Sequence, residues 1–157
     1  MSMRIERLAP NEWDRLRSIR LCSLLESPES FDTTHEQASL LPPEAWGRQL
    51  EDLPTFVAVL DGGDAGIVRG AQDEDGKDRA WLISLWVGPE ARGLSIGEGL
   101  IMKVIDWARS TGTPALVLDV GEGNKHARAL YARMGFLPNG AVPSDCCCEI
   151  QLELVLK

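Results

Sequence analysis

The chain of 157 residues is poor in the residues that build metal centres, and it has no long apolar stretch. Its two histidines, His35 and His126, lie in unrelated segments and no Cys-x-x-Cys pair occurs, so a zinc site would need an unusual ligand set. No stretch approaches the roughly 18 consecutive apolar residues that span a membrane. The first residues also lack the apolar region of a secretion signal. We therefore expect a cytoplasmic protein with no metal and no membrane partner.

Basic residues are scarce as well, because 16 Lys and Arg stand against 24 Asp and Glu. This balance disfavours nucleic acid as a partner, since such binding depends on neutralising phosphates. The excess lies in residues 1–90, with 9 basic and 17 acidic side chains, whereas residues 91–157 carry 7 of each. An acidic half of this kind favours solubility, and it is also compatible with a cationic small-molecule partner. The cysteines, Cys22 and the run Cys146-Cys147-Cys148, are expected to be reduced thiols.

What the chain does contain is an ordinary globular composition, with 44% hydrophobic and 25% charged residues. Its periodicity predicts one α/β domain over residues 1–157, with helices flanking a mixed, mostly antiparallel sheet. The expected strands cover residues 4–7, 55–60, 65–72, 80–87, 115–120 and 149–156, with a further candidate from Phe136. The expected helices cover residues 12–25, 44–53, 97–110 and 124–134. Residues 31–41 are expected to be irregular, and residues 73–78 to form a hairpin turn.

The turn after the strand at 80–87 is the first feature with chemical meaning. A glycine-containing turn that opens a helix points several backbone N–H groups in one direction, which suits a phosphate or pyrophosphate. Gly93 and Gly97 let the backbone approach a ligand closely, and Arg92 adds a charged donor. The turn is not a P-loop, because Gly-Lys-Ser/Thr is absent. It is also not a dinucleotide fingerprint, because Gly97-x-Gly99 lies inside the helix.

The second feature is the helix that contains Tyr131, the only tyrosine of the chain. Asn124 is a suitable N-cap for this helix, and Tyr131 follows two turns later on a neighbouring face. A phenol can donate a proton to a leaving group, but a lone tyrosine can equally be a core residue with a satisfied hydroxyl. His126, in the same helix, is expected at the surface.

In this order the two features resemble the GCN5-related N-acetyltransferase (GNAT) superfamily, most strongly over residues 81–136. The residues that carry the resemblance are Leu85-Trp86-Val87-x-Pro89-x-x-Arg92-Gly93-x-Ser95-Ile96-Gly97 and Asn124-x-x-Ala127-x-x-Leu130-Tyr131-x-x-x-Gly135-Phe136. The resemblance implies the acyl-CoA N-acyltransferase fold, whose fourth and fifth strands splay apart. It implies acetyl-CoA as the donor, an amine-bearing small molecule or peptide as the acceptor, and a homodimer.

The same resemblance assigns roles to residues of this chain. The pantetheine arm of the cofactor would contact the backbone of Leu85 and Val87, and Asn124 would contact the cofactor as well. Tyr131 would act as general acid and protonate the departing CoA thiolate. The pyrophosphate would lie on the turn formed by Arg92, Gly93, Leu94, Ser95, Ile96, Gly97, Glu98 and Gly99.

Two positions depart from the family pattern. Ser95 replaces the usual glycine, and a positive φ there would cost about 1 kcal/mol relative to glycine. The strand at 80–87 has Ser84 as its only polar residue, where many relatives carry a glutamate that acts as base. Deprotonation of the amine must then use water or a carboxylate elsewhere. The candidates are Asp119 and Glu122, followed by Glu26 and Glu36.

These observations predict an acetyl-CoA-dependent N-acetyltransferase that works by direct attack of the amine on the thioester. No covalent enzyme intermediate is needed, because the cysteines lie outside the motif. The missing base leaves an alternative open, a non-catalytic acyl-CoA-binding or regulatory module on the same fold. An interaction domain without a cofactor is a further alternative.

Overall fold

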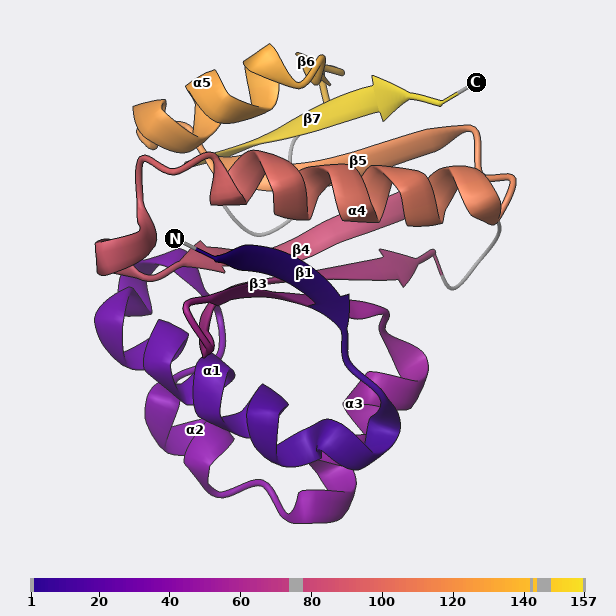
Figure 1. The fold of residues 1–157 in the computed structure, drawn as a ribbon. Coiled ribbons are helices and arrows are strands. Elements are labelled where there is room, and N and C mark those ends of the chain that lie inside the picture. Colours follow the sequence, from indigo (N-terminus) through magenta and orange to yellow (C-terminus); the bar gives the residue numbers. More distant parts are fainter. Residues whose placement is uncertain (1, 74–77, 142, 144–147, 157) are drawn as a thin grey trace.

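The computed structural model describes residues 2–73, 78–141, 143 and 148–156. Within these residues a single sheet of seven strands has the order β1-β2-β3-β4-β5-β7-β6 (Figure 1). All neighbouring strands are antiparallel except β4 and β5, which confirms the predicted mixed sheet. The strands are β1 (Met3–Arg7), β2 (Thr55–Leu60), β3 (Gly63–Gln72), β4 (Ala80–Val87), β5 (Ala115–Gly121), β6 (Leu137–Pro138) and β7 (Glu149–Val155).

Helices cover both faces of this sheet (Figure 1). One face carries α1 (Trp13–Glu26), α2 (His35–Ser39) and α3 (Pro43–Asp52), and the other carries α4 (Ile96–Ser110) and α5 (Lys125–Arg133). Short 3-10 turns lie at Pro10–Glu12, Pro28–Ser30 and Pro89–Ala91. None of the helices in the described part of the chain is long and apolar enough to cross a bilayer.

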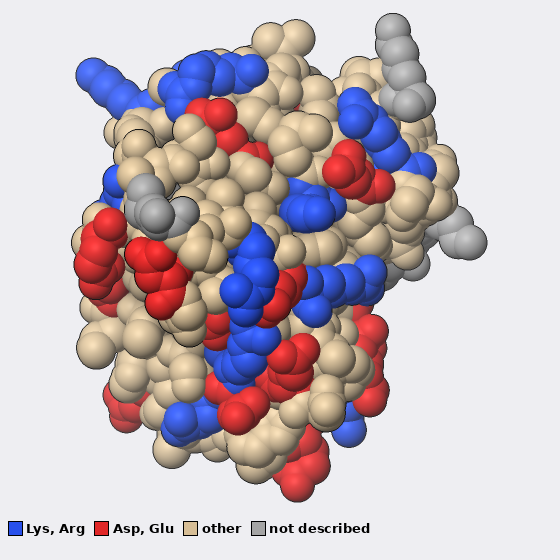
Figure 2. Space-filling model, viewed as in Figure 1, with Lys and Arg blue, Asp and Glu red and all other residues tan. Residues whose placement is uncertain are grey.

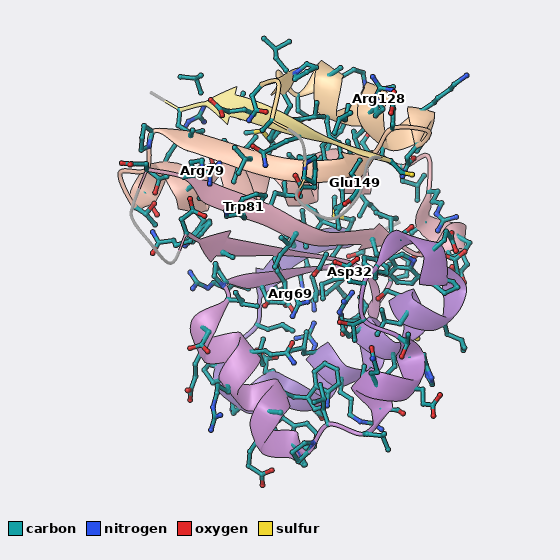
Figure 3. The ribbon with its side chains drawn as sticks, turned by 180° about the vertical axis from the view of Figure 1, so that it is seen from behind. Asp32, Arg69, Arg79, Trp81, Arg128 and Glu149 are labelled. Carbon is teal, nitrogen blue, oxygen red and sulfur yellow. The ribbon has the colours of Figure 1, made fainter. Side chains whose placement is uncertain are left out.

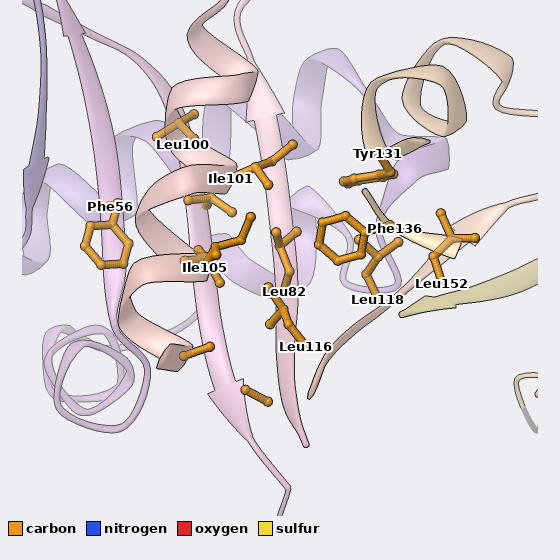
Figure 4. Packing of buried hydrophobic residues seen from close by; sticks show 14 of the residues in the cluster. Phe56, Leu82, Leu100, Ile101, Ile105, Leu116, Leu118, Tyr131, Phe136 and Leu152 are labelled. Atoms are coloured by element: carbon orange, nitrogen blue, oxygen red, sulfur yellow. The ribbon is translucent and has the colours of Figure 1, made fainter. Parts of the chain in front are cut away.

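Two apolar cores fix these layers, one on each face of the sheet. Successive strand residues point to opposite faces, so Ile67 of β3 packs with α1 and α3 while Val68 packs under α4. The larger core joins α4 and α5 to the sheet, with Ile101 and Leu118 among its fully buried side chains (Figure 4). This core holds α4 on the sheet, and α4 begins directly after the turn at residues 92–95, where the sequence predicts the cofactor.

Around β1 and α1, several acidic side chains of residues 1–90 form ion pairs with a basic residue of the same half. Arg15 contacts Glu6 at 3.0 Å, Glu12 at 2.8 Å and Asp64 at 2.7 Å. Figure 2 shows the resulting mixture of basic and acidic side chains over β1 and α1. The acidic excess of residues 1–90 therefore does not form a uniform acidic face in this view.

Most predicted elements are confirmed, and the strands at Thr55–Leu60 and Ala80–Val87 have the predicted ends. The prediction of an irregular segment at 31–41 is wrong, because α2 forms there. The Thr34 Oγ1 accepts the N–H of Gln37 at 3.1 Å, and the Gln37 side chain accepts the N–H of Thr34 at 3.0 Å. This reciprocal cap stabilises a helix of only five residues. Most of the predicted turn at 73–78, and Cys146 and Cys147, lie outside the described residues.

Candidate active site

β4 and β5 separate after only two paired positions, as the resemblance predicts for the central strands. Their Cα partners are Ala80 with Leu116 and Trp81 with Val117, after which β5 continues to pair with β7 alone. Within the part of the chain that the structure describes, residues 83–87 of β4 therefore have no strand partner on this side, and their side chains are half-buried. We call this opening between residues 83–87 and β5 the β4–β5 wedge. Leu85 and Val87, the predicted cofactor contacts, lie along its edge.

A bulge in β4 decides which side chains face each side of the wedge. Ile67 pairs with Trp86 but Arg69 pairs with Ile83, so β4 carries one extra residue in this stretch. Ser84 takes the strained conformation, with φ of 60°, at a cost of about 1–3 kcal/mol. Its hydroxyl lies on the face of α1 and α3, while Leu85 packs against the core under α4. The bulge therefore places a polar and an apolar side chain on opposite faces of one strand.

The turn before α4 forms a hollow of about 280 Å³, which we call the α4 hollow. Gly93 and Ser95 both have positive φ, of 81° and 62°, so the serine adopts the conformation expected of glycine at this position. Ser95 precedes the first residue of α4, and its side chain makes no capping hydrogen bond. The Ser95 side chain therefore leaves the first N–H groups of α4 uncapped, and the positive end of the helix dipole adds to the attraction of such groups for an anion.

The α4 hollow includes most, but not all, of the residues assigned to the pyrophosphate. Leu94 is not among its lining residues, and neither is Gly99, whose Cβ would instead lie 2.9 Å from Ile5 of β1. Asn124 caps α5 by accepting the N–H of Ala127 at 3.2 Å, and it too lies outside the lining. The residues that line the hollow are Val87, Ala91, Arg92, Gly93, Ser95, Ile96, Gly97, Glu98, His126, Leu130 and Arg133.

Helix α5 contributes basic side chains that the sequence did not single out. His126 is exposed, as predicted, but it lines the α4 hollow together with Arg133. Arg133 lies 3.4 Å from Glu98, whose charge it offsets. Lys and Arg side chains gather over α5 in Figure 2. This end of the molecule is therefore suited to an anionic ligand, even though the chain as a whole is acidic.

Arg92 is half-exposed and is held by α1. Its Nη2 donates to Glu26 at 2.7 Å and its Nε donates to the carbonyl oxygen of Val87 at 3.0 Å. Glu26 also accepts from Trp86 Nε1 at 2.9 Å and from the hydroxyl of Ser27. The hydrogen bonds from Ser27, Trp86 and Arg92, in that order, lower the pKa of Glu26. Glu26, one of the candidate bases, is therefore poorly suited to accept a proton from an amine.

Replacing Arg92 with Ala is expected to weaken acetyl-CoA binding about tenfold. A hydrogen bond to a charged group contributes about 1.5–3 kcal/mol, and the half-exposed position of Arg92 favours the lower end. Isothermal titration calorimetry measures the effect, with Arg109→Ala at the far end of α4 as a control. Unchanged affinity in Arg92→Ala would show that the pyrophosphate does not contact this guanidinium.

Tyr131 is 7% exposed and lies in the core between α4 and α5. Figure 4 shows its ring next to that of Phe136, and the two aromatic rings meet edge to face with their centroids 5.8 Å apart. Within the described residues its hydroxyl makes no hydrogen bond, yet it is not among the fully buried unpaired atoms, so it keeps some exposed surface. Burial raises the pKa of Tyr131, which keeps the phenol protonated at neutral pH. In the alternative, a purely structural core tyrosine, the hydroxyl would form a hydrogen bond within the protein.

Three carboxylates lie on the face of the sheet opposite α4 and α5: Asp32 after α1, Asp119 of β5 and Glu149 of β7. Figure 3 shows Asp32 and Glu149 on this face. Asp119 accepts a hydrogen bond from Gln151 Nε2 at 3.2 Å. Burial raises the pKa of Glu149, and the negative charges of Asp119 and Asp32 raise it further. A carboxylate with a raised pKa is a better base than an ordinary one, so this carboxylate cluster is relevant to proton removal.

The remaining candidate bases lie elsewhere. Glu122 is exposed after β5, where its backbone N–H donates to the Cys148 carbonyl and its own carbonyl accepts from Arg128. Glu36 is exposed on α2. Sequence reasoning missed Glu149, although its signal was present: Glu149, Gln151 and Glu153 alternate along β7 and share a face with Asp119. Among the described residues no three His, Cys, Asp or Glu side chains are grouped to hold a metal ion.

Comparison with known proteins identifies the family. The sequence profile of the acetyltransferase (GNAT) family matches residues 13–136. The chain belongs to the GNAT acetyltransferase family. It is 26% identical over 139 residues to mycothiol acetyltransferase of Propionibacterium freudenreichii, covering 85% of this chain and 43% of that protein. It is 32% identical over 104 residues to L-2,4-diaminobutyric acid acetyltransferase of Nocardia farcinica, covering 65% and 50%. The chain thus spans half or less of the length of these curated relatives.

Solved structures show the same GNAT fold over nearly the whole chain. A GNAT acetyltransferase from Streptococcus pneumoniae superimposes with a TM-score of 0.78 at 22% identity, covering 99% of this chain and 100% of that one. The protein yncA from Salmonella typhimurium, solved with its cofactor acetyl-CoA, gives a TM-score of 0.74 at 20% identity, covering 100% and 95%. The predicted fold class is therefore confirmed.

Proposed function

We propose that this GNAT protein transfers the acetyl group of acetyl-CoA to a primary amine by direct attack. The observation that carries the proposal is that the β4–β5 wedge, the α4 hollow and Tyr131 belong to one region joined by α4 and α5. Uncapped amides at the start of α4 suit a pyrophosphate, and the Tyr131 hydroxyl has no hydrogen-bond partner among the residues that the structure describes. The acetyl-CoA in the solved yncA structure supports the choice of donor.

Acetyl-CoA would supply an activated acyl group, and the side chains of this chain would hold it and move protons. The turn at residues 92–97 would bind the pyrophosphate through backbone N–H groups and Arg92. The open edge of β4 at Leu85 and Val87 would receive the pantetheine arm. Tyr131 would donate its hydroxyl proton to the sulfur that leaves as thiolate. Its raised pKa keeps that proton available across the neutral range.

The amine must lose a proton before or during attack, and β4 offers only Ser84 for this task. The Ser84 hydroxyl accepts two hydrogen bonds from Arg69, which makes it a poor proton acceptor. We therefore assign proton removal to the carboxylate cluster of Asp32, Asp119 and Glu149, directly or through water. Glu149 is the best suited of the three, because its pKa is raised. Asp119 then acts mainly by raising the pKa of Glu149, and Glu122, which lies outside the cluster, is not needed for this step.

Replacing Asp119 with Asn is expected to move the acidic limb of the kcat/KM profile to lower pH. Asp119 raises the pKa of Glu149 by charge repulsion, so its removal lowers that pKa and Glu149 loses its proton at lower pH. We expect activity at neutral pH to fall less than about a hundredfold, the lower end of general-base effects. Glu122→Gln is the matched control and should leave the limb in place. An unmoved limb in Asp119→Asn would remove Glu149 as the base.

A second function, a non-catalytic acyl-CoA-binding module, is favoured by one observation. Strand β4 carries no carboxylate, and its one hydroxyl, on Ser84, is committed to Arg69. The two functions separate in one assay, the release of CoA thiol from acetyl-CoA with a panel of primary amines. Sustained, amine-dependent release indicates the enzyme, whereas tight acetyl-CoA binding by calorimetry without release from any amine indicates the module.

A further inference from the structure

Two arginines, Arg20 of α1 and Arg69 of β3, are buried between the helices and the sheet, each with 7% of its surface exposed. Arg69 donates from Nε and Nη2 to the Ser84 hydroxyl, at 3.1 and 2.8 Å, and from Nη1 to Gln49 Oε1 at 2.7 Å. Arg20 lies over the ring of Phe31, 4.7 Å from its centroid, and its Nη1 is 3.4 Å from the Ser23 hydroxyl. We call Arg20 and Arg69 the arginine pair.

The arginine pair has no anionic partner in the described part of the chain, where neither side chain forms an ion pair with Asp or Glu. Burial lowers the pKa of Arg20 to about 10 and that of Arg69 to about 9, and the charge of Arg20 contributes to the second shift. A guanidinium has five N–H donors, and the three hydrogen bonds of Arg69 go to neutral oxygens. Buried charges are normally paired, so this arrangement lacks an anion.

The position of Arg69 links this missing anion to the candidate active site. Ser84, which Arg69 contacts, is the bulge residue of β4, and its neighbour Leu85 lies on the edge of the β4–β5 wedge. Figure 3 shows Arg69 on the same face as Asp32 and Glu149. Arg69 and these carboxylates therefore lie on the same face of the sheet, and Arg69 reaches the wedge through its hydrogen bonds to Ser84. This combination complements a molecule that carries both an ammonium and an anionic group.

We propose that Arg69, supported by Arg20, binds a carboxylate of the acceptor, which is therefore a small molecule with both a primary amine and a carboxylate, as in an amino acid. This inference rests on the proposed acetyltransferase function. The planar fork of a guanidinium matches the two oxygens of a carboxylate, and Arg69 has two N–H groups left for this purpose. The carboxylate cluster would face the amine while Arg69 fixes the other end of the acceptor.

The first test compares acceptors with the unmodified protein. L-amino acids are assayed for CoA-thiol release and, in the presence of CoA, for a shift in melting temperature, each beside its carboxamide and its decarboxylated amine. For one or more amino acids we expect a kcat/KM at least tenfold higher than for the corresponding carboxamide and the corresponding decarboxylated amine, which both lack the carboxylate. Equal rates for all three forms, or reaction of decarboxylated amines alone, would overturn the carboxylate site and leave the acetyltransferase intact. No binding or reaction of any amino acid would also overturn it.

The second test uses Arg69→Gln, Arg69→Lys and Arg20→Gln, with folding followed by melting temperature. Arg69→Gln should raise KM for the best amino acid at least thirtyfold, while KM for its decarboxylated amine and the Kd of acetyl-CoA stay within twofold. Arg69→Lys should recover part of the loss, and Arg79→Gln, at a half-exposed position just before β4 and away from Ser84, should behave as wild type. Equal loss for both acceptors would mean that Arg69 is only structural. Failure of the unmodified protein to bind acetyl-CoA would instead refute the proposed function.

Discussion

Replacing Tyr131 with Phe is expected to lower kcat for acetyl transfer by about 10²–10⁴-fold, the range that general acid catalysis usually supplies. The Kd of acetyl-CoA should change little, because the substitution removes one oxygen and keeps the ring. Steady-state kinetics with the best amine and calorimetry with acetyl-CoA measure the two quantities separately. A fall in kcat with an unchanged Kd is the signature of an interaction made only during the reaction.

The surroundings of Tyr131 explain why the effect should be chemical. The ring packs edge to face against Phe136 and within the core of α4, α5 and the sheet, and Phe preserves these contacts. The hydroxyl has no hydrogen-bond partner among the described residues, so its loss breaks no bond that holds the fold. Burial raises the pKa of the phenol above its usual value near 10, so the proton stays in place until the thiolate forms.

The melting temperature of Tyr131→Phe provides the control. If Tyr131 were purely structural, its substitution would remove a hydrogen bond and lower the stability of the protein by about 1 kcal/mol, and turnover would stay normal. A second variant, Phe136→Leu, disturbs the ring contact and keeps the Tyr131 hydroxyl. It should lower the melting temperature and leave kcat close to that of the wild type. Normal turnover in Tyr131→Phe would leave solvent as the source of the proton.

The sequence predicts the parts of this site that depend on local pattern. The strand at Ala80–Val87, the turn from Arg92 and the helix with Tyr131 are each set by neighbours in the chain, and each forms where expected. The splay of β4 from β5 is also confirmed, but it rests on the family resemblance, because strand pairing between residues 80–87 and 115–121 has no local signature.

The sequence could not predict features that depend on distant contacts. Ser84 reads as a polar position on an otherwise apolar strand, and only the register with β3 reveals the bulge that turns it toward Arg69. No sequence pattern singles out Arg69 or Arg20, and only the packing of α1 against the sheet buries them. Burial raises the pKa of Glu149, and the charges of Asp119 and Asp32, which are far away in the chain, raise it further. In each case the orientation, burial or pKa of the side chain is determined by tertiary contacts and not by the local sequence.

Replacing Gly97 with Val is expected to weaken acetyl-CoA binding about a hundredfold. A Cβ at Gly97 would lie 3.2 Å from Leu130 Cδ2 and 3.9 Å from Val87 Cγ2, and both neighbours line the α4 hollow. The two methyl groups of valine then either fill the hollow or push α5 away from α4. A ligand must then displace the added methyl groups or accept a distorted hollow, and a hundredfold loss of affinity corresponds to about 2.8 kcal/mol of binding free energy.

Gly99→Val is the matched control, because it changes the same helix two residues later. Its Cβ would meet Ile5 Cδ1 of β1 at 2.9 Å, on the side of α4 that faces away from the hollow. Both variants add the same side chain to α4, so the effect on helix propensity is shared and both should lose stability through crowding. We expect only Gly97→Val to lose acetyl-CoA affinity in calorimetry. Equal losses in both variants would point to a general distortion of α4, and unchanged affinity in both would place the pyrophosphate away from this turn.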